Sequence, residues 1–228
     1  MKPAATLVEE FDAIAEALAA VPAIRERLSS AERDLLRWIP AGAGRGLDVG
    51  CGDGLLTRAA ARRGIAMLGI DLSPRMIALA RARSGPDVAY RVADVMNDAI
   101  EPGAAYDIVL SVNTVHHLPL AAIVPRLAAL VAPGGRLLVQ DVVTRARVSD
   151  LPLNLAAGIS RMIERTRGRW RFTSELKRLY HQHGHGERYL DPGEVRGAYQ
   201  PFLPGLQVMH HLQWRYSIVW TRPRAEKT

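Results

Sequence analysis

The stretch Leu47-Asp-Val-Gly-Cys-Gly-Asp-Gly54 decides the fold, because it joins a short apolar segment to a turn that holds three glycines. Residues 46–50 are predicted to form a buried strand, and residues 55–63 the helix that follows it. Glycines at such a turn admit positive φ and let a bound molecule lie directly against the backbone. The sequence therefore predicts an α/β sheet with a ligand site at the carboxyl end of its first strand.

A second predicted strand, 66–71, ends in the carboxylate of Asp71. In α/β folds an acid at this position takes the ribose hydroxyls of a nucleoside. The glycine spacing argues against a dinucleotide, since Leu55 stands where the third glycine of G-x-G-x-x-G belongs. Asp53 would also direct negative charge at a pyrophosphate on the helix N-terminus. A nicotinamide-dependent oxidoreductase is therefore disfavoured.

Further segments continue the alternation of strands and helices that is typical of a sheet covered on both faces. A helix is predicted from Met76 to Arg83 behind Ser73-Pro74, which supply an N-cap and a first-turn proline. Three more strands are predicted over 88–92, 106–112 and 136–143, the last after a tight turn at 132–135. A helix over 193–202 and a closing strand pair, 206–215 and 216–222, complete the chain.

These motifs resemble those of the class I S-adenosylmethionine-dependent methyltransferases of the small-molecule type. The first motif of that family reads acid-x-Gly-x-Gly-x-Gly and is matched from Asp48 to Gly54, and the resemblance extends over 46–143. It implies a Rossmann-like seven-stranded sheet of order 3-2-1-4-5-7-6, with the last strand antiparallel and helices on both faces. It also implies S-adenosyl-L-methionine as cofactor, with Asp71 on the ribose and Asp94 on the adenine. The residues expected to contact the cofactor are Asp48, Gly50, Cys51, Gly52, Gly54, Asp71, Leu72, Met76, Asp94, Val95 and Ser111.

Two histidines, His116 and His117, follow the fourth strand, where parallel sheets present residues to ligands. An imidazole titrates near pH ~6.5 and can accept the proton of a hydroxyl or amine acceptor. We therefore predict that one of them is the general base, His116 in preference because it lies nearer the strand tip. The alternative is that a histidine bonds a backbone carbonyl and only shapes the loop.

The length of 228 residues suits one domain with a sizeable core. We divide it into an N-terminal helical cap (1–40), a cofactor-binding core (41–144), a basic helical insert or lid (145–190), and a last core helix with a β-hairpin (191–228). Apolar residues recur at helical spacing in the cap, which either covers the acceptor pocket or packs on the sheet.

The insert 145–190 carries ten basic and four acidic residues. It is either a lid over an acceptor with an anionic portion or a solvated helix with an oligomer face. Within it, His181-x-His183-x-His185 raises the question of a metal site, which needs three or four converging ligands. Gly184 and Gly186 instead favour a loop of solvated or substrate-contacting histidines, and no metal is predicted.

The net charge of +7 raises nucleic acid as a partner, but no zinc motif, repeat or aromatic-basic patch accompanies it. The expected acceptor is a small molecule, such as an aromatic or polyketide-like product of secondary metabolism, methylated on oxygen or nitrogen. No apolar run reaches the ~18 residues of a membrane span, and the single cysteine, Cys51, fits a cytoplasmic enzyme. The alternatives are a nucleic-acid methyltransferase and a cofactor-binding protein without methylating activity.

Overall fold

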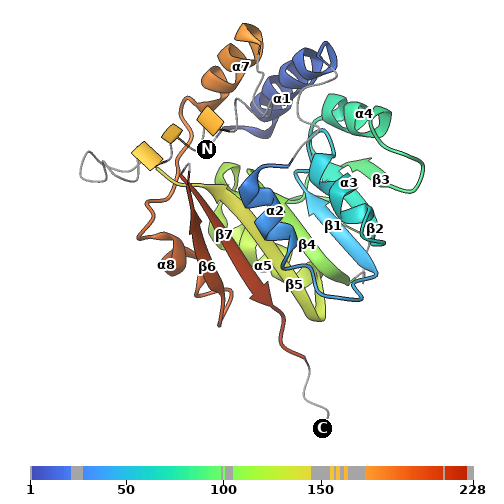
Figure 1. Cartoon of the computed structure of the whole chain (residues 1–228), viewed down its shortest axis with the longest axis vertical. Coiled ribbons are helices and arrows are strands. Elements are labelled where there is room, and N and C mark those ends of the chain that lie inside the picture. Colours follow the sequence, from blue (N-terminus) through green and yellow to red (C-terminus); the bar gives the residue numbers. More distant parts are fainter. Residues whose placement is uncertain are drawn as a thin grey trace.

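The computed structural model describes residues 2–21, 28–98, 100, 105–144, 155–156, 158–159, 162–163, 173–212 and 214–224. Its centre is a seven-stranded sheet of order β3-β2-β1-β4-β5-β7-β6 (Figure 1). Strands β1 to β5 are mutually parallel, whereas β7 runs antiparallel to both β5 and β6. The predicted strand order is confirmed. The strands are β1 (Arg45–Val49), β2 (Ala66–Asp71), β3 (Ala89–Val92), β4 (Tyr106–Val112), β5 (Val131–Val142), β6 (Gln207–His211) and β7 (Arg215–Thr221).

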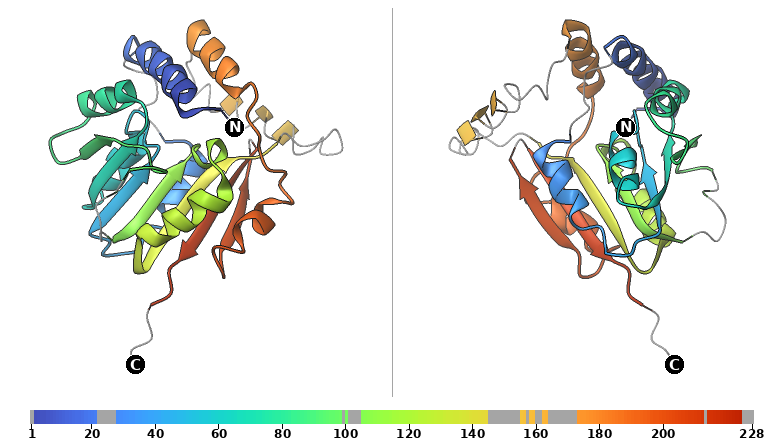
Figure 2. Two further views of the ribbon diagram at one scale, coloured as in Figure 1. Left: turned by 180° about the vertical axis from the view of Figure 1, so that it is seen from behind. Right: turned by 45° about the vertical axis from the view of Figure 1, so that its right-hand side comes forward.

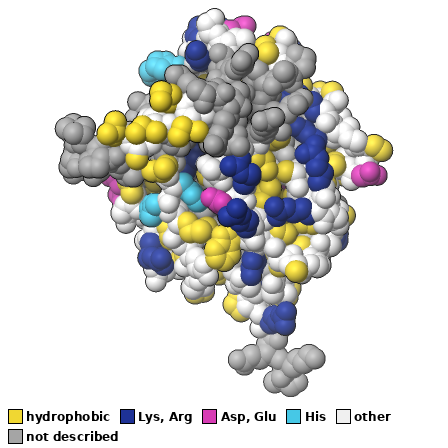
Figure 3. Space-filling view, viewed as in Figure 1, with side chains coloured by type: hydrophobic (Ala, Val, Ile, Leu, Met, Phe, Trp, Pro, Cys, Tyr) yellow, Lys and Arg dark blue, Asp and Glu magenta, His cyan; other side chains and the backbone are white. Residues whose placement is uncertain are grey.

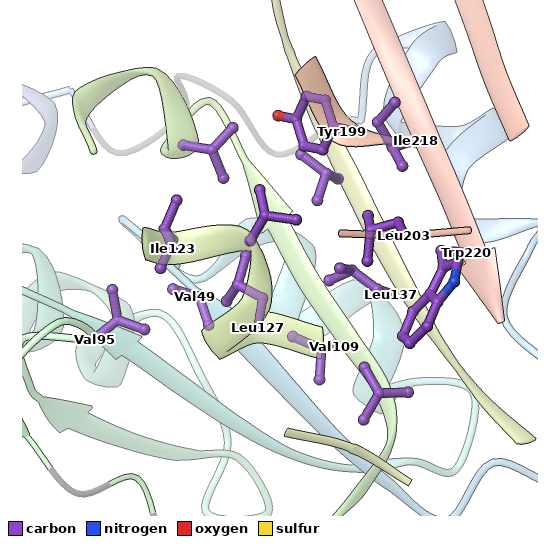
Figure 4. Packing of buried hydrophobic residues seen from close by; sticks show 14 of the residues in the cluster. Val49, Val95, Val109, Ile123, Leu127, Leu137, Tyr199, Leu203, Ile218 and Trp220 are labelled. Atoms are coloured by element: carbon purple, nitrogen blue, oxygen red, sulfur yellow. The ribbon is translucent and has the colours of Figure 1, made fainter. Parts of the chain in front are cut away.

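Helices cover both faces of the sheet, as its almost wholly apolar central strand β4 requires. On one face lie α5 (Leu120–Leu130) and α8 (Val195–Tyr199), and on the other α2 (Ser30–Leu36) and α3 (Leu55–Ala61). Successive β4 residues alternate between the two cores, so that Val109 packs toward α5 and Leu110 toward α2 and α3. The larger core is shown in Figure 4, where Leu127 of α5 faces the sheet.

Three helices gather at the end of the sheet where the parallel strands terminate (Figures 1 and 2). They are α1 (Ala4–Ala19), α4 (Pro74–Ala82) and α7 (Ser174–Gly184). Figure 2 shows α1 beside α7, and Ile14, Leu18, Met76 and Leu176 form one buried cluster between the three. The apolar stripe of α1 therefore packs on other helices above the strand ends, whereas α2 packs on the sheet.

Some predicted boundaries were wrong. The last helix spans only 195–199 instead of 193–202, and Pro201, which lacks a backbone N–H, cannot continue its hydrogen-bond ladder. Strand β5 begins at Val131, ahead of the predicted turn, and Gly134 within it has a φ of 82°. The arginines at 145, 147, 161, 165, 167, 169 and 171 lie outside the described residues, so the charge of the insert is not placed in space.

In the part of the chain that the structure describes, no helix has the length and apolarity needed to cross a membrane. The face seen in Figure 3 carries many Lys and Arg side chains among hydrophobic ones and few acidic ones, in keeping with the net charge of +7.

Replacing the fully buried Leu137 of β5 by alanine should lower the free energy of unfolding by about 2–5 kcal/mol, through lost burial and the cavity left behind. Leu155, which is 67% exposed, is the matched control, and its replacement should change stability by no more than about 0.5 kcal/mol. Urea denaturation of both variants measures the difference. Equal effects at the two positions would contradict the placement of the core.

Candidate cofactor site and histidine cluster

The glycine turn after β1 is held in left-handed backbone at Gly50, Gly52 and Gly54, with φ of 71°, 53° and 77°. A Cβ added to Gly50 would lie 2.1 Å from Oγ1 of Thr114, so Gly50 lets the loop after β4 approach the turn closely. A Cβ added to Gly52 would meet nothing within 4 Å. Gly52 therefore leaves open space beside the turn.

That open space belongs to a cavity of about 200 Å³ at the carboxyl ends of β1, β2 and β4. Its wall includes nine of the eleven residues predicted to contact the cofactor, which the chain brings together from four separate segments. These nine are Asp48, Gly50, Cys51, Gly52, Asp71, Leu72, Met76, Asp94 and Val95.

The other two predicted residues, Gly54 and Ser111, do not line the cavity. Gly54 is the N-cap of α3, and a Cβ there would lie 2.4 Å from the hydroxyl of Tyr90. Ser111 is buried and donates a hydrogen bond of 3.2 Å to the carbonyl of Val49, which ties β4 to β1. Both residues shape the site from behind the cavity wall, and their predicted contact with the cofactor stays a prediction.

Asp71 is anchored by the backbone on both sides of its carboxylate. Oδ2 accepts the N–H of Gly52 at 2.9 Å, and Oδ1 accepts the N–H of Ser73 at 2.9 Å. Burial raises the pKa of Asp71, and these two N–H groups act against the rise. The carboxylate thus has a fixed orientation at the cavity wall, with lone pairs left for two further donors.

Asp48 lies deeper, at the end of β1, and accepts a hydrogen bond of 2.6 Å from Oγ1 of Thr57. Burial raises its pKa to about 7; the Thr57 hydrogen bond opposes the rise, and the negative charge of Asp71 adds to it. Burial and the nearby Asp71 likewise raise the pKa of the Cys51 thiol. A protonated thiol in the turn contributes its backbone and its small volume rather than a nucleophile.

Two other acids of the turn region are engaged locally. Asp94 accepts the backbone N–H of Met96 at 2.8 Å and the side-chain amide of Asn97 at 2.7 Å, which fixes the loop after β3. Asp53 pairs with Arg83 at 2.7 Å. This ion pair offsets the negative charge that Asp53 would direct at a pyrophosphate. Leu55 still occupies the position of the third glycine of a dinucleotide motif, and it is buried at the start of α3.

Residues of three helices, which were not among the predicted site residues, form another part of the cavity wall. Leu7, Phe11 and Leu18 come from α1, Glu32 from α2 and Tyr180 from α7. The apolar spacing of α1 was visible in the sequence, but a stripe does not say which surface it covers. The described part of the cap therefore encloses the cavity with mainly apolar side chains.

His116 and His117 form a 3-10 turn, η1 (Val115–His117), directly beyond β4. The backbone N–H of His116 donates to Oδ2 of Asp141 at 3.0 Å, and Nδ1 of its ring lies 2.7 Å from Oδ1 of the same carboxylate. Asp141 is fully buried in β5. His117 lines the cavity, whereas His116 does not. Burial, then the neighbouring His116 and His183, lowers the pKa of His117 to about 2.

The segment 181–185 was predicted to be a loop of solvated or substrate-contacting histidines, and the prediction of a loop was wrong. The segment belongs to α7, which Thr173 caps by accepting the N–H of Leu176. His183 is buried, with its ring centroid 4.9 Å from that of His117 and its Nδ1 2.7 Å from Oε2 of Glu10. His181 and His185 are exposed on the outer side of the helix end. Glycines at 184 and 186 terminate the helix instead of loosening the whole segment.

Asp48 makes stability depend on pH in a defined direction. An aspartate of the unfolded chain titrates near ~3.9, whereas Asp48 in the fold titrates near 7, so the folded state holds the extra proton between these values. Raising the pH from 5 to 8 should therefore lower the unfolding free energy of the wild type by about 2 kcal/mol relative to Asp48→Asn. Urea denaturation of both proteins at the two pH values measures this; parallel pH dependences would refute the assignment.

A model of the methyltransferase domain matches residues 47–135. The chain is 41% identical over 108 residues to a ubiquinone biosynthesis O-methyltransferase of Xylella fastidiosa, covering 46% of this chain and 44% of that protein. It thus spans less than half the length of this relative.

The chain is also 31% identical over 190 residues to an uncharacterized methyltransferase of Mycobacterium tuberculosis. This longer match covers 81% of this chain and 90% of the relative. Among solved structures, a phosphoethanolamine N-methyltransferase of Haemonchus contortus in complex with S-adenosyl-L-methionine shares the fold. The TM-score is 0.61 at 17% identity, over 85% of this chain and 52% of the other. With the motif order and the sheet topology, these matches show that the chain belongs to the class I S-adenosylmethionine-dependent methyltransferases.

Proposed function

We propose that this protein transfers the methyl group of S-adenosylmethionine to a hydroxyl oxygen of a small molecule. The observation that carries the proposal is one cavity whose wall contains the glycine turn, Asp71 and His117, with the ring of His116 directly behind that of His117 at a centroid distance of 3.8 Å. A hydroxyl acceptor is favoured over an amine because His116 is held by the buried carboxylate of Asp141, an arrangement suited to taking a proton. The similarity to a ubiquinone biosynthesis O-methyltransferase supports the same choice.

The cofactor would be held by the residues that share the cavity wall. Asp71 has free lone pairs for the ribose hydroxyls, and Asp94 stands beyond β3 at the position expected for adenine recognition. Gly50 and Gly52 would let the amino acid portion approach the turn, while Met76 and Val95 supply apolar contacts. Bound S-adenosylmethionine supplies an electrophilic methyl carbon, so the remaining task of the protein is to position and deprotonate the acceptor.

His116 is the proposed base. With Nδ1 bound to Asp141, its Nε2 is the nitrogen left to accept a proton, and Asp141 stabilises the imidazolium that results. His117 lines the cavity but is a very weak base, given its pKa of about 2. We assign His117 to the shape of the acceptor end and His116 to proton transfer.

We propose that α1 and the insert 145–190, which contains α7, close the acceptor pocket. The insert would act as a lid whose basic residues face an anionic portion of the acceptor. The apolar wall of Leu7, Phe11 and Leu18 suits an aromatic or polyketide-like molecule. We further propose a cytoplasmic location and, for any oligomer, an interface through the insert or the N-terminal helices. Robust methylation of tRNA or DNA by the purified protein would contradict this choice of acceptor.

Asp71→Ala should weaken the binding of S-adenosylmethionine at least about tenfold, since each hydrogen bond to a charged acceptor is worth about 1.5–3 kcal/mol. Asp87→Ala, an exposed aspartate outside the cavity, is the control and should bind as the wild type does. Calorimetric titration with S-adenosylmethionine, S-adenosylhomocysteine and NADH measures this and tests the cofactor class together. If Asp71→Ala perturbs the fold, Asp71→Asn replaces it. Unchanged affinity in a folded variant, or tight binding of NADH alone, would sink the assignment.

His116→Gln should lower kcat for a hydroxyl acceptor by about 10²–10⁴-fold while leaving cofactor affinity nearly intact. Asp141→Asn should lower kcat in the same way but less, because it removes the group that orients the ring. His210→Gln, on the exposed side of β6, is the matched control and should retain wild-type kinetics. Full activity of His116→Gln would leave catalysis to positioning alone and exclude His116 as the base.

A further inference from the structure

Three histidines from two distant segments converge beside the acceptor end of the cavity. His116 and His117 come from η1 and His183 from α7, and one ring nitrogen of each lies within 4.8 Å of the other two. His117 and His183 are buried, and the side chain of His116 is 9% exposed. Both ring nitrogens of His117 are buried without a hydrogen-bond partner. A buried imidazole that satisfies neither nitrogen is costly unless something absent from the protein chain itself engages it.

Each of these histidines also has a carboxylate on its Nδ1 side. Asp141 lies 2.7 Å from Nδ1 of His116, and Glu10 lies 2.7 Å from Nδ1 of His183. Oε2 of Glu187 lies 3.3 Å from Nδ1 of His117, close enough for an ion pair although the geometry makes no hydrogen bond. At His116 and His183 the carboxylate bound to Nδ1 fixes the tautomer and leaves the lone pair on Nε2. This is the outer-shell arrangement found around metal-binding histidines.

The charge of the surrounding side chains is not balanced. Asp141 and Glu187 have side chains that are 0% and 1% exposed, and Glu10 is partly buried. Lys2 lies 2.7 Å from Glu10 and 3.7 Å from Glu187. Counted over these four side chains, the charge is −2, which a divalent cation would neutralise. Oε1 of Glu187 is itself buried without a hydrogen-bond partner.

We propose that His116, His117 and His183 bind a divalent transition-metal ion, with Zn²⁺ as the preferred ion. Neutral imidazole nitrogens suit Zn²⁺, Cu²⁺, Fe²⁺ and Ni²⁺, whereas Mg²⁺ and Ca²⁺ prefer oxygen ligands. Tetrahedral Zn²⁺ with bonds of about 2.0–2.1 Å places its nitrogens roughly 3.3 Å apart. Ring rotations that draw the three nitrogens together by up to about 1.5 Å would achieve this.

Aromatic packing alone explains the cluster less well. Phe11 does contact both buried rings, at 5.7 Å from the centroid of His117 and 4.6 Å from that of His183. Packing against Phe11 accounts for their apolar surface but satisfies no ring nitrogen. It also gives no reason for a carboxylate beside each of the three imidazoles.

Three protein ligands leave a fourth position for water or a substrate oxygen, and His117 connects the cluster with the cavity. An ion there would bind a hydroxyl oxygen and lower its pKa, which is the same activation that His116 would give as a base. When the ion is bound it would use the lone pair of His116 and activate the hydroxyl itself, so the proposed role of His116 as the base applies to the metal-free protein. The proposed metal site does not depend on methyl transfer, so it can be tested without an acceptor.

The test is a titration of chelator-treated full-length protein with ZnCl₂, in the absence of cofactor, by competition with a chromophoric chelator. We expect one tight site per chain. His117→Ala and His183→Ala should each weaken it by more than the about 10–100-fold that loss of an outer-shell partner costs, and Asp141→Asn should weaken it within that range. Co²⁺ in place of Zn²⁺ should give visible d–d absorption that is lost in His117→Ala.

The matched control is His181→Ala. His181 and His185 form an exposed pair with ring nitrogens 3.3 Å apart, and such a pair binds metal weakly on many protein surfaces. Zinc binding that follows His181 and ignores His117 would overturn the proposal, as would the absence of a tight site in the wild type. If an alanine variant fails to fold, the test uses His183→Gln instead, provided that its melting temperature matches that of the wild type. None of these outcomes depends on methyltransferase activity, so failure of this inference leaves the proposed function untouched.

Discussion

The hydrogen bonds that the Asp71 carboxylate accepts from Gly52 and Ser73 are the constraint on which the site depends. One oxygen fixes the glycine turn after β1, and the other fixes the start of α4 after β2. Two adjacent strand ends are thereby joined through a single, partly buried carboxylate, whose charged form the loss of water alone would disfavour. Because the backbone donors satisfy that charge, the acid can remain at the wall of a cavity where a ligand replaces water.

The cap follows from the same anchor. The side chain of Ser73 donates to Asp12 of α1 at 2.5 Å while its own oxygen caps α4. Two residues earlier on α1, Glu10 holds His183 of α7, and Lys2 donates to both Glu10 and the carbonyl of His183. The N-terminal segment thus bridges the first half of the sheet and a helix that arrives some 170 residues later. Movement of α1 would therefore disturb the cofactor wall and the histidine cluster together.

Much of this architecture was readable from local patterns. The turn from Gly50 to Gly54, the acid of Asp71 and the apolar strands fix the sheet, because each pattern is complete within a few residues. The position of His183 was not readable, since it depends on how α7 packs against α1 across a long chain separation. The environment of Ser111 was not readable for a different reason. Residues at a strand tip point alternately to the two faces of the sheet, and the hydroxyl of Ser111 donates to the neighbouring strand.

The cavity is acid-rich in a chain that is basic overall, and this contrast bears on the cofactor. Asp48, Asp71 and Asp94 all reach its wall. Asp53 also reaches it but is paired with Arg83. Burial raises the pKa of Asp48 to about 7, and the negative charges of the nearby Asp71 and Asp53 add to this rise. A phosphate-bearing nucleotide would add to this negative charge, whereas a cationic sulfonium with an ammonium group offsets it. The charge of the wall thus favours S-adenosylmethionine, as does the shape of the glycine turn. Binding of this cationic cofactor would stabilise the ionised form of Asp48, which burial alone disfavours.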